Sequence, residues 1–215
     1  MFPGLLISKV NFLPACCTLF INNYSDMNTL SFSSPLLLIS LIFFSEIKLP
    51  ENGNERVVQK MKRKNNVPVG DCRIVIDKSD YLMRLYDEQG LFARYPVVFG
   101  AAPGEDKWKE GDRRTPEGSF KIRAIRKHKK WDRFILLDYP NQKSIEKFER
   151  RKKEHKLSET DKMGGSIGIH GTWPHDAYLI DKYKNWTDGC VSLKNQDVQD
   201  LLQYIKPGTE VIIQK

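Results

Sequence analysis

The sequence predicts a mainly β domain with a few short helices. After residue 70, most apolar segments are short and are separated by glycine-containing or charged turns, which is the spacing of strands. Only one segment, near the C-terminus, shows a clear helical period. The part of the chain that carries nearly all of the charge is long enough to bury a core and short enough to form one domain.

The first elements of this domain are expected to form an antiparallel meander. Residues 73–77 (RIVID) predict a strand, and residues 81–86 and 91–99 are two further apolar segments. The polar segment 87–90 (DEQG), which ends in glycine, separates the last two and is typical of a hairpin turn. We therefore expect three consecutive strands that pair in sequence order.

The middle of the chain alternates between loops and strands. Residues 100–118 are rich in glycine and charge and predict a long loop, whereas residues 119–124 and 134–138 predict strands. Residues 141–158 are heavily charged with few apolar positions, which favours a partly exposed helix. Residues 166–170 predict a short strand that ends at a histidine.

The C-terminal segment predicts one helix and a closing strand. Asn195 is a suitable N-cap for the helix. Four apolar residues then follow at helical spacing: Val198, Leu201, Leu202 and Ile205. A Pro-Gly pair at 207–208 ends this pattern, and residues 211–213 (VII) predict the last strand.

The N-terminal segment differs sharply from the rest. Lys9 and Asp26 are the only charged residues in segment 1–45, and residues 36–44 form a nearly continuous apolar run. A run of this length resembles the core of a secretory signal, and an uncleaved membrane anchor is the alternative. We therefore expect an exported protein that contacts the membrane only through this segment.

Charge and polarity bound the remainder of the chain. Residues 46–69 are polar and lysine-rich and predict a linker, so the domain is expected at 70–215. The net charge of +8 includes two basic runs, at 126–130 and 150–153. A solvated face is the favoured interpretation of these runs, with contact to an anionic wall polymer or membrane surface as the alternative. An exported chain would not meet nucleic acid, so we expect no nucleic-acid partner.

The four cysteines do not form a disulfide framework. Cys16 and Cys17 fall in the N-terminal segment, which leaves Cys72 and Cys190 in the domain. Cys72 opens a predicted strand, where a small buried hydrophobic residue is expected. A bridge between Cys72 and Cys190 stays open and would block a reactive thiol.

Two glycine-containing turns carry the strongest chemical signal. Residues 167–172 (IGIHGT) deliver His170 into a turn, and residues 187–191 (TDGCV) present Cys190. A thiolate is a strong nucleophile, and a nearby imidazole both generates and holds it. Either residue alone is better explained as structural, but the two turns together predict a cysteine acyl-transfer enzyme with Cys190 as nucleophile and His170 as general base.

The residues around this pair predict supporting roles. Gly189 permits close backbone approach, so the amides of Gly189 and Cys190 are candidates for an oxyanion hole. Gly171 and Thr172 are expected to orient the imidazole through backbone acceptors. Asp188 would raise the thiol pKa if it faced the sulfur, so we expect it to point towards the substrate and to bind an ammonium group.

Aromatic residues flank the pair, and no metal is expected. Trp173 and Trp186 bracket the site in sequence and are candidates for stacking on substrate, with an ordinary packing role equally open. A zinc site built from His170, His175 and Cys190 would lack a fourth ligand, and the sequence contains no Cys-x-x-Cys pair. We expect neither a metal nor another cofactor.

The domain resembles the L,D-transpeptidase catalytic domain family, also called YkuD. The resemblance runs from about residue 73 to 214 and rests on five segments in order: Tyr86-Asp87 with Gly90, the loop after Gly100, residues 111–118 (GDRRTPEG), residues 169–172 (IHGT) and residues 188–191 (DGCV). It implies a bent β-sandwich or barrel of mixed strands with a few short helices. It also implies a bacterial cell-wall enzyme of the periplasm or envelope, which acts as a monomer on peptidoglycan stem peptides.

The family chemistry assigns the reaction. Cys190 would attack the amide between a diaminopimelate or lysine residue and the terminal D-alanine, and the thioacyl-enzyme would pass its acyl group to an amine. Transfer to the amine makes a crosslink or attaches a wall lipoprotein. Transfer to water would instead make the protein a hydrolase, either an L,D-carboxypeptidase or a peptidase that releases crosslinks or lipoprotein. A wall-binding module without catalysis is a further alternative.

Two positions depart from the common family pattern. Many relatives have histidine or serine where this chain has Asp188, and arginine where it has Ser192. The sequence resembles a branch of the family with T-D-G-C and no such arginine. Ser192 is a candidate substrate-binding residue by position, but another base must then bind the carboxylate of the stem peptide.

Overall fold

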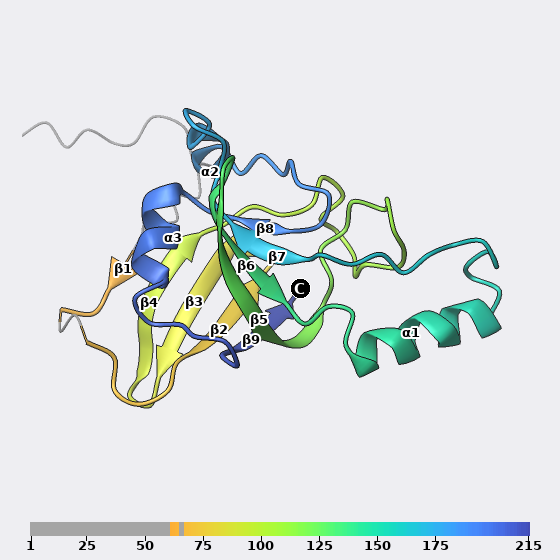
Figure 1. Ribbon diagram of the computed structural model, residues 1–215, viewed down its shortest axis with the longest axis horizontal. Coiled ribbons are helices and arrows are strands. Elements are labelled where there is room, and N and C mark those ends of the chain that lie inside the picture. The colour runs from red at the N-terminus through yellow and green to blue at the C-terminus, as the bar shows by residue number, and fades with distance from the viewer. Residues whose placement is uncertain (1–60, 65–66) are drawn as a thin grey trace, which may run out of the picture. The chain divides into compact units, whose positions relative to one another are not determined.

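The computed structural model describes residues 61–64 and 67–215, and this part of the chain is mainly β (Figure 1). Its strands form one mixed sheet in the order β1-β4-β3-β2-β9-β5-β6-β7-β8. The predicted fold class is confirmed. The predicted signal or anchor segment 1–45 and most of the predicted linker lie outside the described residues. Within them, no helix has the length and apolar character needed to cross a membrane.

The elements have the following bounds. The strands are β1 Met61–Lys62, β2 Arg73–Asp77, β3 Leu82–Asp87, β4 Gly90–Pro96, β5 Gly118–His128, β6 Asp132–Leu137, β7 Gly168–His170, β8 Val191–Ser192 and β9 Glu210–Gln214. The helices are α1 Gln142–Lys153, α2 Tyr178–Asp181 and α3 Asn195–Leu201.

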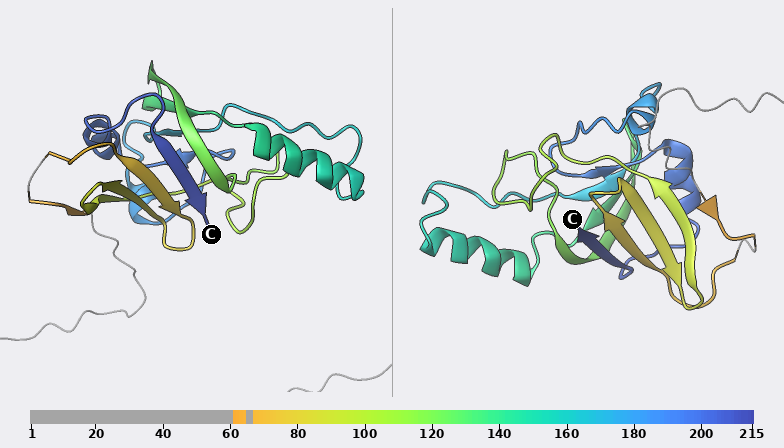
Figure 2. Two further views of the ribbon diagram at one scale, coloured as in Figure 1. Left: turned by 90° about the horizontal axis from the view of Figure 1, so that it is seen from below. Right: turned by 180° about the vertical axis from the view of Figure 1, so that it is seen from behind.

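The meander forms as the alternating pattern predicts. β2, β3 and β4 pair antiparallel in order, and the β3–β4 hairpin turns between Asp87 and Gly90. Ile74 and Ile76 of β2 are fully buried, and the closing strand β9 lies parallel to β2 with Val211 and Ile213 as their partners. The first and last strands of the predicted domain therefore pair at the centre of the sheet (Figure 2).

β5 joins this half of the sheet to the half that carries the site. Its first residues, Gly118–Lys121, pair with β9, and residues from Ile122 to His128 pair with β6. The register shifts between Ile122 and Ala124, and such an irregularity bends a strand. β6, β7 and β8 then follow in the sheet order.

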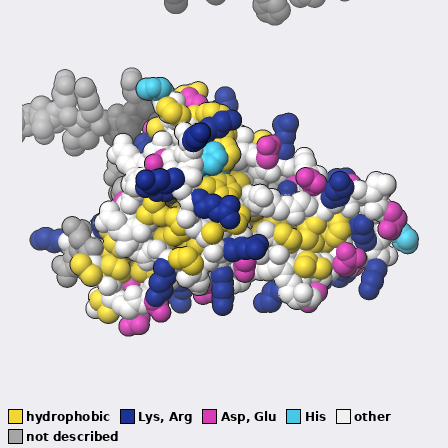
Figure 3. All heavy atoms as spheres, viewed as in Figure 1, with side chains coloured by type: hydrophobic (Ala, Val, Ile, Leu, Met, Phe, Trp, Pro, Cys, Tyr) yellow, Lys and Arg dark blue, Asp and Glu magenta, His cyan; other side chains and the backbone are white. Residues whose placement is uncertain are grey.

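The β5–β6 hairpin is longer than the sequence pattern predicts. The basic run 126–130 was expected outside strands, yet its first three residues pair with β6 up to His128. None of residues 126–128 is buried, so no hydrophobic periodicity in the sequence identifies them as part of a strand. Lys and Arg side chains are dispersed over the face of the molecule that Figure 3 shows. The Lys and Arg residues of the run 126–130 are exposed, whereas Arg151 of the run 150–153 is paired with Asp106 at 2.8 Å.

The predicted linker also contributes to the sheet. Met61 and Lys62 pair with Arg94 and Ala93 at the edge strand β4. Arg63 donates to both carboxylate oxygens of Asp87, at 2.9 and 3.1 Å. The prediction of a linker is therefore wrong for residues 61–64, because backbone pairing and an ion pair hold them without any apolar pattern.

A chain that begins at Val69 is expected to fold but to melt at a lower temperature than the full chain. It lacks β1 and Arg63, whose guanidinium lowers the pKa of Asp87 below its usual value. Because the pKa of Asp87 is lower in the folded than in the unfolded protein, the Arg63–Asp87 ion pair stabilises the fold at pH values above the unfolded-state pKa. This stabilisation is lost as the pH falls through the folded-state pKa. Thermal unfolding of full-length Arg63→Ala should show a deficit at neutral pH that shrinks at acidic pH. An unchanged deficit would contradict the ion-pair contribution.

The helices are fastened by specific side chains. The Asn141 side chain caps α1 by accepting from the Ser144 amide at 3.1 Å, and Phe148 buries the apolar side of this helix. α3 begins one residue earlier than predicted, with Lys194 rather than Asn195 at the N-cap position. Asn195 is therefore the first residue of the helix. Its side-chain oxygen packs so closely against Gly171 that a Cβ at position 171 would lie only 1.8 Å from it.

Candidate functional site

Two short parallel strands bring His170 and Cys190 together. In the register of β7 and β8, His170 pairs with Ser192 and Ile169 pairs with Val191. Cys190 immediately precedes β8, so it lies level with Gly168 in this register. Side chains two residues apart on a strand share a face, so this register places Cys190 on the face of the β7–β8 pair that carries His170.

The turn before Cys190 accepts only glycine at position 189. Gly189 has φ +134°, and a Cβ there would lie 2.7 Å from the carbonyl oxygen of Arg114. Thr187 holds the same turn, because its hydroxyl accepts from the Gly189 amide at 3.1 Å and donates to the Cys190 carbonyl at 2.7 Å. Thr187 is not among the residues predicted for the site, although a hydroxyl residue three positions before Cys190 is a usable signal.

The imidazole of His170 is oriented by a backbone carbonyl. Its Nδ1 lies 2.7 Å from the carbonyl oxygen of Gly171, and because a carbonyl only accepts, Nδ1 carries the proton. Nε2 is then the basic nitrogen. The hydroxyl of Ser192 donates to the same carbonyl at 3.2 Å, so Gly171 orients the ring.

Ser192 does not belong with the substrate-binding residues. Its side chain is fully buried and its hydroxyl is used by the Gly171 carbonyl. Ser192 pairs with His170 in the sheet and is buried there, which its position in the sequence does not reveal. Ser192 is therefore not assigned a role in substrate binding.

Aromatic rings enclose His170. Trp131 stacks on it at a centroid distance of 4.3 Å, Phe134 lies at 5.9 Å and nearly parallel, and Trp186 meets it edge-on at 5.5 Å. His128 also stacks on Trp131, at 4.3 Å. Burial among these rings lowers the pKa of His170 to about 4, so the imidazole is neutral at physiological pH.

Trp131 is the neighbour that the sequence analysis missed. It lies at the end of the β5–β6 hairpin, between segments predicted as separate strands, and its carbonyl accepts from the Gly171 amide at 3.2 Å. No local pattern marks it, since only the fold of the hairpin brings it over His170. Trp186 lies near the site, as its position in the sequence suggests. Its ring contacts the imidazole of His170 edge-on, which is a packing role.

The thiol of Cys190 is protonated in the substrate-free protein. Burial raises its pKa to about 11, a hydrogen bond with the Gly168 backbone lowers it, and the Asp188 carboxylate raises it. Sγ donates to the Ser166 carbonyl at 3.7 Å, and among the described residues the structure shows no hydrogen bond from Sγ to His170. The pair at rest is thus a neutral thiol and a neutral imidazole.

Alkylation of Cys190 by iodoacetamide is expected to accelerate steadily from neutral to strongly alkaline pH. The thiolate is the reacting form, and a pKa of about 11 places its formation above physiological pH. Mass spectrometry of the peptide that contains Cys190 gives the rate at each pH. A plateau below about pH 8, near the unperturbed thiol pKa, would show a preformed thiolate and contradict this electrostatic picture.

The remaining predicted residues lie around this centre. Asp188 is 97% exposed, with Arg113 Nε 3.9 Å from its carboxylate. Trp173 is 37% exposed, and the ammonium of Lys130 lies 4.8 Å from its ring centroid. Thr172 is buried, and the structure describes no hydrogen bond from it to His170. Since Thr187 uses the Gly189 amide, the Cys190 amide is the better candidate for an oxyanion donor.

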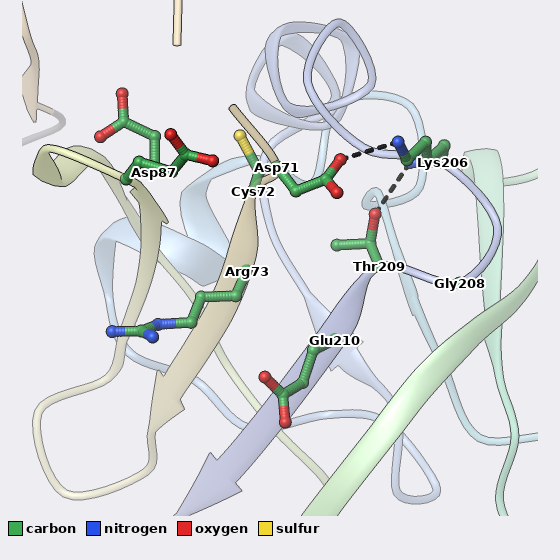
Figure 4. A pocket seen from close by; sticks show the side chains of 9 residues that line it. Asp71, Cys72, Arg73, Asp87, Lys206, Gly208, Thr209 and Glu210 are labelled. Atoms are coloured by element: carbon green, nitrogen blue, oxygen red, sulfur yellow. Dashed lines mark hydrogen bonds and ion pairs between the residues drawn. The ribbon is translucent and has the colours of Figure 1, made fainter. Parts of the chain in front are cut away.

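Other features lie apart from this centre. Cys72 and Cys190 are both free thiols, so no disulfide bridge joins them. Cys72 lines a separate cavity of about 340 Å³ (Figure 4). The residues around this cavity include the Lys206–Asp71 ion pair and none of the predicted site residues. In the described part of the chain, no group of three or more His, Cys, Asp or Glu residues could hold a metal ion.

Comparison with known proteins agrees with this architecture. The family model of the L,D-transpeptidase catalytic domain (YkuD) matches residues 71–213. The helical cell shape determining protein Pgp2 from Campylobacter jejuni superposes with a TM-score of 0.50 at 23% identity, over 67% of this chain and 48% of that chain. Bd1075 from Bdellovibrio bacteriovorus gives a TM-score of 0.48 at 22% identity with the same coverage.

A third solved structure is also similar. An L,D-transpeptidase from Mycobacterium tuberculosis gives a TM-score of 0.45 at 13% identity, over 67% of this chain and 57% of that chain. The chain thus spans about half the length of the solved structures that it matches. Among curated protein sequences, the comparison finds no match.

Proposed function

As this chain belongs to the YkuD family of L,D-transpeptidase catalytic domains, we propose that it is an exported cysteine acyltransferase that acts on peptidoglycan stem peptides. The observation that carries the proposal is the placement of Cys190 and His170 on one face of the β7–β8 pair. The glycine turn at 189 and the Gly171 carbonyl support it, because they present the sulfur and orient the imidazole.

In the proposed reaction, Nε2 of His170 takes the thiol proton as Sγ of Cys190 attacks the amide carbonyl carbon of the stem peptide. The oxyanion of the tetrahedral intermediate accepts from the Cys190 amide. The intermediate collapses to a thioester, and the imidazolium returns the proton to the departing amine of D-alanine. The thioester then passes its acyl group to the amine of a second stem peptide, which restores the thiol.

The protonation states require the substrate to take part in activating the thiol. With pKa values of about 4 for His170 and about 11 for Cys190, proton transfer between them is uphill in the free protein. The Asp188 carboxylate contributes to this by raising the thiol pKa. A substrate ammonium group that binds Asp188 would remove that contribution, so binding and activation are coupled.

Hydrolysis at the same site is the second candidate function. It is favoured by the openness of the rim, where Asp188 is 97% exposed two residues from the sulfur. A water molecule would then take the place of the acceptor amine at the thioester. The same Cys190 and His170 roles then yield a carboxypeptidase or a peptidase that releases crosslinks or lipoprotein.

Incubation of the purified protein with defined muropeptides tests the proposal. A tetrapeptide donor with a second stem as acceptor should yield a dimer and free D-alanine, both detected by mass. Loss of D-alanine without a dimer would favour the hydrolase. Binding of muropeptide without any product would contradict both and favour a wall-binding module.

Export is part of the proposal and rests on the uncharged apolar composition of residues 1–45. Cell fractionation of a bacterium that expresses the full chain should place the protein in the periplasm or envelope. Recovery in the cytoplasmic fraction alone would contradict export.

A further inference from the structure

Two oppositely charged side chains lie at the rim of the site and are both exposed. Nε of Arg113 is 3.9 Å from Oδ1 of Asp188, and the side chains are 65% and 97% exposed. A pair this exposed gains little from its own attraction, since water competes for both groups. Both charges are therefore available to a ligand that arrives beside Cys190.

Arg113 is held in place by a rigid turn. The Asp112 carboxylate accepts from the amides of Trp108 at 2.6 Å and Arg114 at 3.0 Å, and from Nζ of Lys107 at 2.7 Å. Arg113 itself has φ +54°, a left-handed conformation that an arginine adopts at an energetic cost.

This turn packs directly against the nucleophile turn. A Cβ on Gly100 would lie 2.2 Å from the Arg113 carbonyl oxygen and 3.0 Å from Cα of Gly189. The two turns thus meet over a glycine that leaves no room for a side chain. The backbone of Arg113 therefore lies next to the turn that presents Cys190.

Other side chains near the turn are already engaged. Ser192 is buried. Arg114 forms an ion pair with Glu105 at 2.7 Å, and Lys107 is buried against Asp112. Position 192, two residues after Cys190, carries no cation that could bind a substrate carboxylate. Arg113 supplies a guanidinium at the same centre from a different loop.

We propose that Arg113 and Asp188 together bind a zwitterionic α-amino acid group, with the guanidinium on its carboxylate and Asp188 on its ammonium. This inference rests on the proposed function and names its substrate class. The free end of the diaminopimelate side chain carries both charges on one carbon, which matches a guanidinium and a carboxylate that lie 3.9 Å apart. Lysine offers only the ammonium, so the site selects diaminopimelate stems.

Steady-state kinetics on three tetrapeptides test the proposal: one with diaminopimelate, one with its side-chain carboxylate amidated and one with lysine. Arg113→Ala should raise KM for the diaminopimelate peptide about tenfold, the scale of a lost charge-assisted hydrogen bond, with kcat unchanged. KM for the other two peptides should not change. Asp188→Asn should raise KM for all three, because each carries the ammonium group. Arg113→Lys should restore part of the affinity.

Two controls separate binding from loop integrity. Arg123→Ala removes an exposed arginine of β5 and should leave KM unchanged for every peptide. Arg113→Gly relieves the left-handed strain, so it should melt no lower than wild type and still show the raised KM.

The outcomes also separate this proposal from the one on which it rests. An unchanged KM in Arg113→Ala, or an equal rise for all three peptides, would overturn the zwitterion subsite alone. Absence of turnover by the wild-type protein on every peptide would overturn the proposed function and the subsite with it.

Discussion

Cys190→Ala is expected to abolish turnover of a stem peptide while the protein stays folded. The sulfur is the proposed nucleophile, and removal of a nucleophile typically costs a factor of about 10⁴ or more in kcat. The side chain gives up its backbone contacts with the Ser166 carbonyl, at 3.7 Å, and with Gly168, which are weak interactions for a thiol. Product formation measured by mass, with thermal unfolding measured on the same sample, checks both parts.

Cys72→Ala is the matched control. Cys72 is the other free thiol of the described chain and lines a cavity that contains no predicted site residue. Its loss should leave turnover near the wild-type value. Retained activity in Cys190→Ala, or its loss in Cys72→Ala, would contradict the assignment of the nucleophile.

His170→Gln is expected to lower kcat by about 10² or more, the usual scale for the loss of a general base. Glutamine fills most of the space among Trp131, Phe134 and Trp186, which alanine would leave empty. His175→Gln is the control, because His175 is exposed. Similar rates in the two variants would show that the base has been misassigned.

The buried imidazole also predicts a pH dependence of stability. Burial lowers the pKa of His170 to about 4 in the folded protein, so the unfolded chain binds this proton more readily. The contribution to stability is present above the unfolded-state pKa of about 6.5 and declines as the pH falls towards 4. The melting temperature of the wild type should therefore fall more between pH 7 and 4 than that of His170→Gln. Equal falls would contradict the burial of a neutral imidazole.

Most of the front half of the fold follows from local pattern. Residues 73–77 alternate buried and partly exposed side chains, and the polar turn before Gly90 separates two apolar segments, so the meander is readable without tertiary knowledge. β1 and the far end of the β5–β6 hairpin are not readable. Their residues show no apolar alternation, and backbone pairing with a neighbouring strand stabilises them.

The candidate site likewise combines residues that the sequence predicts with contacts that only the tertiary structure shows. The two glycine turns point to Cys190 and His170 because a turn must place a reactive side chain where backbone groups can approach it. The role of Gly189 depends on Arg114, from a loop far away in the sequence, and the enclosure of His170 depends on Trp131. Neither contact leaves a local signal.

The sequence by itself determined the family resemblance, the two candidate reactive residues and the order of most strands, because these depend on residue type and short-range spacing. Only the tertiary structure decided that Ser192 is buried, that Trp131 covers His170 and that Arg113 stands beside Asp188. Each of these depends on strand register or on the packing of two loops distant in sequence. Register and packing arise from the whole sheet, so no window of the sequence contains them.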